Sequence, residues 1–81
     1  MKELRFTPDA LRDLRRLKGA GEPIVAKLER YAATGAGDVS ALAGALSGTR
    51  RLRIGDYRAI FEETAERLLV TRVGHRRDIY D

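Results

Sequence analysis

The sequence predicts an α+β fold of two layers, with an N-terminal strand, a helical hairpin and then an antiparallel three-strand meander. Three observations predict it. Apolar residues recur at helical spacing from position 10 to position 32, and after Gly48 the apolar period changes to two. A chain of 81 residues also suits a single domain over residues 1–81, built around one modest core.

The first strand leads directly into the first helix. Leu4 and Phe6 alternate with charged neighbours, as in a short half-buried strand. Thr7 then suits the N-cap of a helix, Pro8 its first helical position and Asp9 its positive first turn. We therefore expect the helix to begin at once after the strand.

The first helix is expected to continue to Gly19 and to be followed, after a short turn, by a second helix opened by Glu22-Pro23. The apolar face of the second helix consists of Ile24, Leu28, Tyr31 and Ala32. Gly35 suits the left-handed residue that ends a helix. The small, Gly- and Ala-rich segment from Gly35 to Gly48 is expected to be a loop with room for one helical turn.

Three strands are expected over residues 50–54, 57–63 and 67–73, with turns at Gly55-Asp56 and Thr64–Glu66. Glycine at the first position of a two-residue loop suits a type II′ hairpin turn. The main core is expected to consist of Leu4, Phe6, Leu14, Leu17, Leu28, Leu52, Ile54, Phe61 and Val70.

Opposed arginines are the most informative feature of the meander. With Gly55-Asp56 as the turn, Arg53 faces Arg58, and period two places Arg51 beside them on the face away from the helices. A four-residue turn before the last strand would put Thr71 beside Arg58. Like charges directly opposed destabilise a sheet, so these side chains either splay apart in solvent or bind an anion.

The residues at the end of the last strand favour the anion site. His75 and Arg76 follow that strand and are expected to lie next to the three arginines. His75 is the only histidine, and histidine is the residue type best suited to proton transfer near neutral pH, although a single histidine is more often a surface residue. Tyr80 would either cover an edge of the core, or stack on a base or lie near a ribose hydroxyl.

The composition is basic and free of cysteine. There are 16 Lys and Arg against 12 Asp and Glu, a net charge of +4, and lysine occurs only at positions 2, 18 and 27. Arginine presents a planar donor fork that suits phosphate, and a basic chain predicts an acidic partner, either nucleic acid or an acidic protein. The absence of cysteine and of an apolar leader after Met1 leads us to expect a cytoplasmic protein without membrane contact.

The sequence predicts neither a metal nor a cofactor. It contains no His or Cys pair for zinc, no carboxylate cluster in the basic segment and no Gly-rich phosphate loop before a helix. A nuclease reaction here would therefore be independent of metal. RNA supplies its own nucleophile, the 2′-OH, and cations would stabilise the transition state.

The motifs of this basic region resemble the RelE branch of the RelE/ParE toxin superfamily. They are Leu46-Ser47-Gly48, Arg51-Leu52-Arg53, Asp56-Tyr57-Arg58, Val73-Gly74-His75-Arg76 and Tyr80. The order of strand, helical hairpin and meander also fits a RelE-like fold, so the resemblance covers nearly the whole chain. His75 lies where other members carry Lys or His, which implies a role as acid or base.

The resemblance also implies roles for the other site residues. Arg51 and Arg53 match a basic strand pair that contacts phosphate, and Arg58 matches the arginine that holds the scissile phosphate. Arg76 matches an arginine assigned to the leaving group or the transition state, and Tyr80 a tyrosine at the attacked nucleotide. Members often carry lysine at the first two positions, and because arginine is a poor general base, it would stabilise charge rather than move protons.

Three functions follow as expectations. The leading one, which the resemblance implies, is a ribosome-dependent endoribonuclease toxin that cleaves mRNA in the A site by 2′-OH attack and is neutralised by a cognate antitoxin. The second is a ParE-like toxin that inhibits DNA gyrase. The third is an inactive module that acts only in an antitoxin-bound repressor, which would contact DNA through the antitoxin. The Arg, His and Tyr set favours the first.

Overall fold

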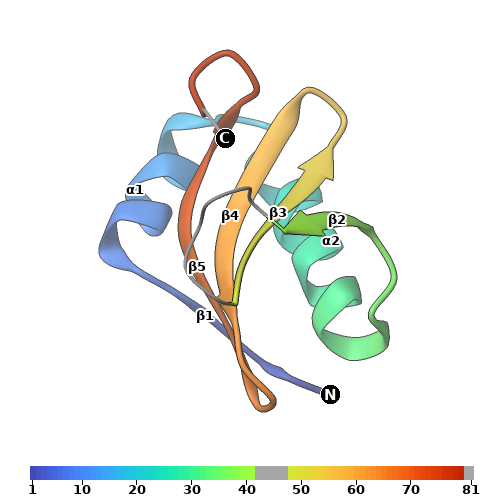
Figure 1. The fold of residues 1–81 in the computed structure, drawn as a ribbon. Helices are drawn as coiled ribbons and strands as arrows, with labels where there is room; N and C mark the ends of the chain where they lie inside the picture. The colour runs from blue at the N-terminus through green and yellow to red at the C-terminus, as the bar shows by residue number, and fades with distance from the viewer. Residues whose placement is uncertain (42–47, 80–81) are drawn as a thin grey trace.

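The computed structural model describes residues 1–41 and 48–79, which form two helices and a five-stranded sheet (Figure 1). The elements are β1 (Glu3–Phe6), α1 (Pro8–Arg16), α2 (Gly21–Thr34), β2 (Asp38–Ala41), β3 (Thr49–Ile54), β4 (Tyr57–Glu63) and β5 (Arg67–His75). The strand order is β1-β5-β4-β3-β2, in which β1 runs parallel to β5 and the other neighbours are antiparallel. The predicted α+β fold is confirmed, with one strand more than expected.

The additional strand, β2, lies in the segment that was expected to be a loop. It pairs with β3 so that Val39 lies opposite Leu52 and packs against the core. Its other residues are exposed or small, so the sequence has no apolar alternation that would mark a strand. The backbone of β3 supplies the pairing partner instead. Leu42 and Leu46, the larger apolar residues of this segment, lie outside the described residues.

The signals at the start of α1 and at the end of α2 act as expected. The Thr7 hydroxyl accepts a hydrogen bond of 3.1 Å from the Ala10 N–H, and Pro8 occupies the first turn of α1. α1 ends at Arg16, before the expected Gly19, and α2 begins at Gly21. Gly35 ends α2 with a φ of 77°, and its N–H bonds to the Tyr31 carbonyl. Within the described residues, no helix is both long and apolar enough to cross a membrane.

The core lies between the two helices and one face of the sheet (Figure 1). Every residue predicted for the core belongs to this cluster or packs against it. Leu68 and Val73 of β5 are buried as well, although they were not among the predicted core residues. The helices therefore cover one face of the sheet, and the functional argument concerns the other face.

α1 is attached to the edge of β5 beyond the point where β1 ends. The Thr7 hydroxyl donates to the Thr71 carbonyl at 3.2 Å. Further along, the Asp13 carboxylate accepts from the Val73 N–H at 2.9 Å and from Arg72 Nε at 2.8 Å. These side chains satisfy backbone groups of β5 that have no strand beside them in the β1–β5 pairing, which ends at Val70.

A β-bulge in β5 shifts its register. Ile60 of β4 pairs with Arg72. The next residue, Phe61, pairs with Val70, so Thr71 is the extra residue. Side chains alternate between the two faces of a strand. Each residue of β5 after Thr71 therefore points to the opposite face from the one that a strand without the bulge would give it.

The expected register, with Thr71 beside Arg58, is therefore wrong. Arg58 pairs with Gly74, and Val73 turns into the core. The same shift determines where His75 lies, because a strand without the bulge would have placed it on the other face.

Candidate anion-binding site

Four side chains form what we call the arginine face: Arg51, Arg53, Arg58 and Arg76. The pairing of β3 with β4 places Arg53 directly opposite Arg58, and Arg51 lies two residues before Arg53 on the same face. The predicted register of this hairpin is confirmed. Arg50, the first arginine of the run, pairs with Phe61 and lies on the helix-covered face instead.

The turn between β3 and β4 holds this register. Gly55 has a φ of 57°, and no residue other than glycine has a positive φ in the described part of the chain, so Asp56 does not. A positive φ at the first loop residue alone is the pattern of a type II′ turn, as predicted. This turn brings the ends of the two basic strands together.

Arg58 is the centre of the arginine face. It is only 8% exposed, and its Nη1 donates to the carbonyls of Gly55 and Tyr57, both at 2.8 Å. Burial lowers the pKa of Arg58, and the charges of Arg53, Arg51 and Arg76 lower it further, against a smaller opposite effect of Asp56. A buried guanidinium among three other cations is a site where a bound anion would be stabilising.

This environment differs from the expectation for Arg58 in one respect. The sequence offers no sign of a structural role, yet the guanidinium ties down the carbonyls of the β3–β4 turn. Replacing Arg58 therefore affects the turn as well as the charge. Arg53 and Arg76 are exposed, so their charges can be removed with less structural cost.

Two aspartates lie at the rim of the arginine face. Asp38 of β2 is 3.9 Å from Arg53, and Asp56 of the turn is 3.9 Å from Arg76. Both are exposed pairs at the limit of ion-pair distance, and such pairs contribute little to stability. Arg51 Nη2 is 3.4 Å from the Ser40 hydroxyl of β2. Asp38 and Ser40 could not be predicted as neighbours of the arginines, because the sequence does not predict β2.

Arg76 is attached to the turn through its backbone. Its N–H donates to the Asp56 carbonyl at 2.7 Å, which extends the pairing of β4 with β5 by one bond. Its side chain contributes to the lowered pKa of Arg58. The prediction that Arg76 lies near the three arginines of the hairpin agrees with this geometry.

His75 lies on the opposite face of the sheet from the arginines. It pairs with Tyr57, and the two rings meet edge to face with centroids 5.6 Å apart. Tyr57 packs against the core, so His75 lies on the side of the helices. The expectation that His75 adjoins the arginine patch is therefore not met, and the bulge at Thr71 is the reason.

Two further predictions concern Tyr80 and metal ions. Tyr80 lies outside the described residues. Within residues 1–41 and 48–79, no group of three or more His, Cys, Asp or Glu side chains could hold a metal ion.

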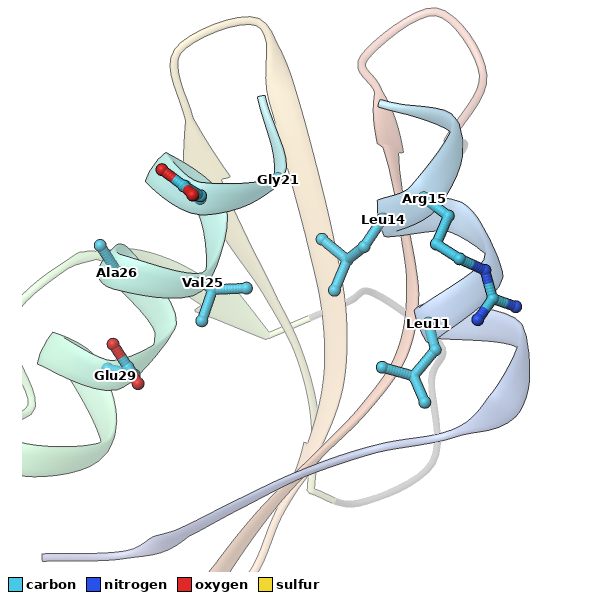
Figure 2. Close-up of a pocket in the computed structure, with 8 residues that line it drawn as sticks. Leu11, Leu14, Arg15, Gly21, Val25, Ala26 and Glu29 are labelled. Carbon is cyan, nitrogen blue, oxygen red and sulfur yellow. The ribbon is translucent and has the colours of Figure 1, made fainter. Parts of the chain in front are cut away.

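A groove of about 540 Å³ lies on the helix side, between α1 and α2 (Figure 2). Leu11, Leu14 and Val25 point into it, and Arg15 and Glu29 lie at its border. Its lining is mainly apolar, so it does not resemble a phosphate site. The arginine face is the stronger candidate for the chemistry.

Comparison with known proteins gives a family and a set of similar folds. A family model described as the ParE toxin of type II toxin–antitoxin systems, parDE, matches residues 4–80. None of the curated proteins matches the sequence.

Three solved structures illustrate the likeness in fold. A chain of the RelB–RelE antitoxin–toxin complex from Methanococcus jannaschii has a TM-score of 0.77 and 24% identity, with 95% of each chain covered. A chain of the Escherichia coli DinJ–YafQ toxin–antitoxin complex has a TM-score of 0.80 and 12% identity, covering 99% of this chain and 98% of that one. A chain of the toxin–antitoxin complex RelBE2 from Mycobacterium tuberculosis has a TM-score of 0.66 and 28% identity, covering 93% and 98%. The first two likenesses concern the fold alone.

Proposed function

Since this chain belongs to the ParE toxin family of type II toxin–antitoxin systems, within the RelE/ParE superfamily, we propose that it is a ribosome-dependent endoribonuclease that cleaves mRNA in the A site. The observation that carries the proposal is Arg58, a buried guanidinium surrounded by Arg51, Arg53 and Arg76. A cluster of this kind suits the phosphate backbone of a nucleic acid.

The reaction would use the 2′-OH of the RNA as nucleophile. Its oxygen forms a bond to the adjacent phosphorus as the bond from phosphorus to the 5′-oxygen breaks, leaving a cyclic phosphate and a free 5′-OH. The 2′-OH loses its proton and the leaving 5′-oxygen gains one. Negative charge grows on the phosphoryl oxygens in the transition state, and preoriented cations stabilise that charge.

Within this proposal, the arginines hold and neutralise the phosphate. Arg58 faces the scissile group, Arg51 and Arg53 contact the neighbouring backbone, and Arg76 stabilises the leaving group. None of them is suited to proton transfer, because a guanidinium stays protonated. We propose Tyr80 at the attacked nucleotide, as the resemblance implies.

The partner of the toxin in this proposal is a cognate antitoxin. Chains of similar fold were solved in complexes with RelB and DinJ. We expect the antitoxin of this protein to be partly disordered when free and to lay an acidic segment over the arginine face. Such a segment would cover the cations that the RNA needs.

The test uses purified ribosomes programmed with a defined mRNA. The wild-type protein should cleave in the A site, and Arg76→Ala should reduce the cleavage rate by about 10²- to 10³-fold, the usual effect of losing one preoriented charge-stabilising donor. Arg58→Ala should do the same, with thermal unfolding measured alongside because Arg58 also bonds the turn. Arg12→Ala is the matched control, since Arg12 is an exposed arginine of α1 paired with Asp9. Equal rates for wild type and Arg76→Ala would overturn the proposal.

Inhibition of DNA gyrase, the expectation for a ParE-like toxin, is the second candidate, because the matching family model is described as a ParE toxin. A supercoiling assay with purified gyrase separates the two: inhibition of gyrase with intact mRNA would replace the nuclease proposal. Neither activity, combined with operator binding of the antitoxin complex, would favour a module that acts only in repression.

A further inference from the structure

The segment after β5 folds back on itself, and His75 makes three of the contacts that hold it. The His75 carbonyl accepts from the N–H groups of Asp78 and Ile79 at 2.8 and 3.2 Å. Its ring Nδ1 accepts from the Arg77 N–H at 3.2 Å. The turn over residues 75–79 therefore depends on both the main chain and the side chain of His75.

Nδ1 is the atom of the imidazole that bonds to the turn. A side-chain acceptor that receives the N–H two residues later is the arrangement of an Asx turn, normally made by Asp or Asn. The bond requires an Nδ1 that carries no proton, because only an unprotonated ring nitrogen can accept. Nδ1 of His75 thus takes the place of the side-chain oxygen that Asp or Asn supplies in an Asx turn.

Gly74 provides the surface onto which the turn folds. A Cβ at this position would lie 3.0 Å from Cγ1 and 3.1 Å from Cδ1 of Ile79. These distances are too short for ordinary packing, so Ile79 lies against the bare backbone of Gly74. Gly74 is also the residue that pairs with Arg58. The turn is therefore packed directly against the strand beside the central arginine.

The turn also fixes Arg76, its second residue. The Arg76 N–H bonds to the Asp56 carbonyl, and residues on both sides of Arg76 are held, by the β4–β5 pairing at His75 and by the bond at Arg77. The direction in which Arg76 leaves the strand is set by these contacts. It is this direction that brings the Arg76 charge near Arg58.

We propose that His75 is a positioning residue, whose Nδ1 closes the turn over residues 75–79 and thereby holds Arg76 at the arginine face. It acts from the other side of the sheet, through an accepted hydrogen bond, and not by transferring a proton to or from RNA. The consequence for cleavage rests on the proposed nuclease function, whereas the consequence for the turn does not.

The proposal makes a distinction that substitution can test. In His75→Asn the amide oxygen replaces Nδ1 as the acceptor for the Arg77 N–H but cannot transfer protons. In His75→Leu a side chain of similar bulk has no acceptor. Gly74→Ala disturbs the same turn through Ile79 and leaves the imidazole in place.

Hydrogen exchange at the Arg77 amide reports the turn without reference to activity. Losing one hydrogen bond should reduce protection by about 2- to 10-fold in His75→Leu, while His75→Asn should remain close to wild type. Ribosome-dependent cleavage should follow the same order: near wild type in His75→Asn, and lower in His75→Leu and Gly74→Ala, on the order of 10² for a misplaced group.

The exchange and cleavage results together decide whether His75 is a positioning residue. Retained protection with lost cleavage in His75→Asn would overturn the positioning role, because it would show that the imidazole itself is needed. Retained protection of the Arg77 amide in His75→Leu would show that Nδ1 does not close the turn. If wild-type protein cleaves no mRNA, the proposed function fails, and the exchange measurement alone still decides whether Nδ1 closes the turn. Gly74→Ala tests the same turn if His75→Leu does not fold.

Discussion

Replacing Asp13 with alanine should weaken the attachment of α1 to β5. Asp13 is 7% exposed, and one of its carboxylate oxygens, Oδ2, accepts hydrogen bonds from the Val73 N–H at 2.9 Å and from Arg72 Nε at 2.8 Å. The Arg76 N–H bonds to the Asp56 carbonyl, so in the alternating antiparallel ladder the pair Ala59–Val73 is not hydrogen-bonded. The Val73 N–H therefore points away from β4 toward Asp13. The alanine variant leaves that buried donor without a partner.

The expected loss in the free energy of unfolding can be estimated from these contacts. A buried N–H left unsatisfied costs about 1–3 kcal/mol. The Arg72 side chain is 56% exposed, so water replaces its lost partner and the ion pair adds only about 0–1 kcal/mol. We expect a loss of about 1–4 kcal/mol, which for a domain of this size lowers Tm by about 4–30 °C.

The pH dependence of stability provides a second measure of the same contact. Burial raises the pKa of Asp13, but the hydrogen bonds from Arg72 and the Val73 N–H, with the charges of Arg72 and Arg16, outweigh it and leave the pKa below its ordinary value of 3.8. A carboxyl group with a lowered pKa in the folded state stabilises the protein above its unfolded pKa. That contribution is lost as the pH falls through the folded pKa.

Chemical and thermal unfolding of wild type and Asp13→Ala between pH 7 and pH 2 would test both statements. The difference in free energy should be largest near neutral pH and should shrink below pH 4 or so, as the wild-type carboxyl becomes protonated. Arg72→Ala is the control and should cost less than Asp13→Ala, because the bond to Val73 survives. An Asp13→Ala loss below about 1 kcal/mol, or one equal to that of Arg72→Ala, would refute the reasoning.

Three further predictions concern the turn, the antitoxin and metal ions. Gly55→Ala should cost about 1–2 kcal/mol in unfolding experiments, since its φ of 57° strains an L-residue although a Cβ would meet nothing within 4 Å. Gly21→Ala, in the first turn of α2, should be neutral or stabilising by up to about 1 kcal/mol. If Gly21→Ala destabilised the protein more than Gly55→Ala, the result would contradict the turn assignment. Antitoxin binding measured by calorimetry should weaken as salt rises, and an affinity independent of salt would exclude contact with the arginine face. EDTA should leave cleavage unchanged beyond the requirement of the ribosome itself, and rescue of lost activity by an added divalent ion would argue against the proposed chemistry.

Features that depend on neighbouring residues could be predicted from the sequence. The Thr7 cap and the Gly55 turn are set by a few residues, and both are found as predicted. The hairpin register follows from that turn, so the opposition of Arg53 and Arg58 was predictable as well. The core followed from apolar periodicity within each element.

Features that depend on distant partners could not be predicted. β2 becomes a strand because β3 lies beside it, and the bulge at Thr71 has no mark in the sequence of β5. An uninterrupted period of two would have put His75 on the arginine face. Its position near Tyr57 is a consequence of one extra residue, and this is why the functional reading of His75 changes.

The parallel pairing of β1 with β5 has a consequence for how the protein folds. Thr7 and Thr71, which this arrangement joins, are 64 residues apart, whereas β3 and β4 are separated by a two-residue turn. Closing the long loop costs about 3 kcal/mol more chain entropy than closing the short one. The strands β3 and β4, which carry most of the arginine face, are neighbours in the sequence. β1 pairs with β5, which lies far from it in the sequence. We therefore expect β1 to dock late, so that its mutation would accelerate unfolding more than it slows folding.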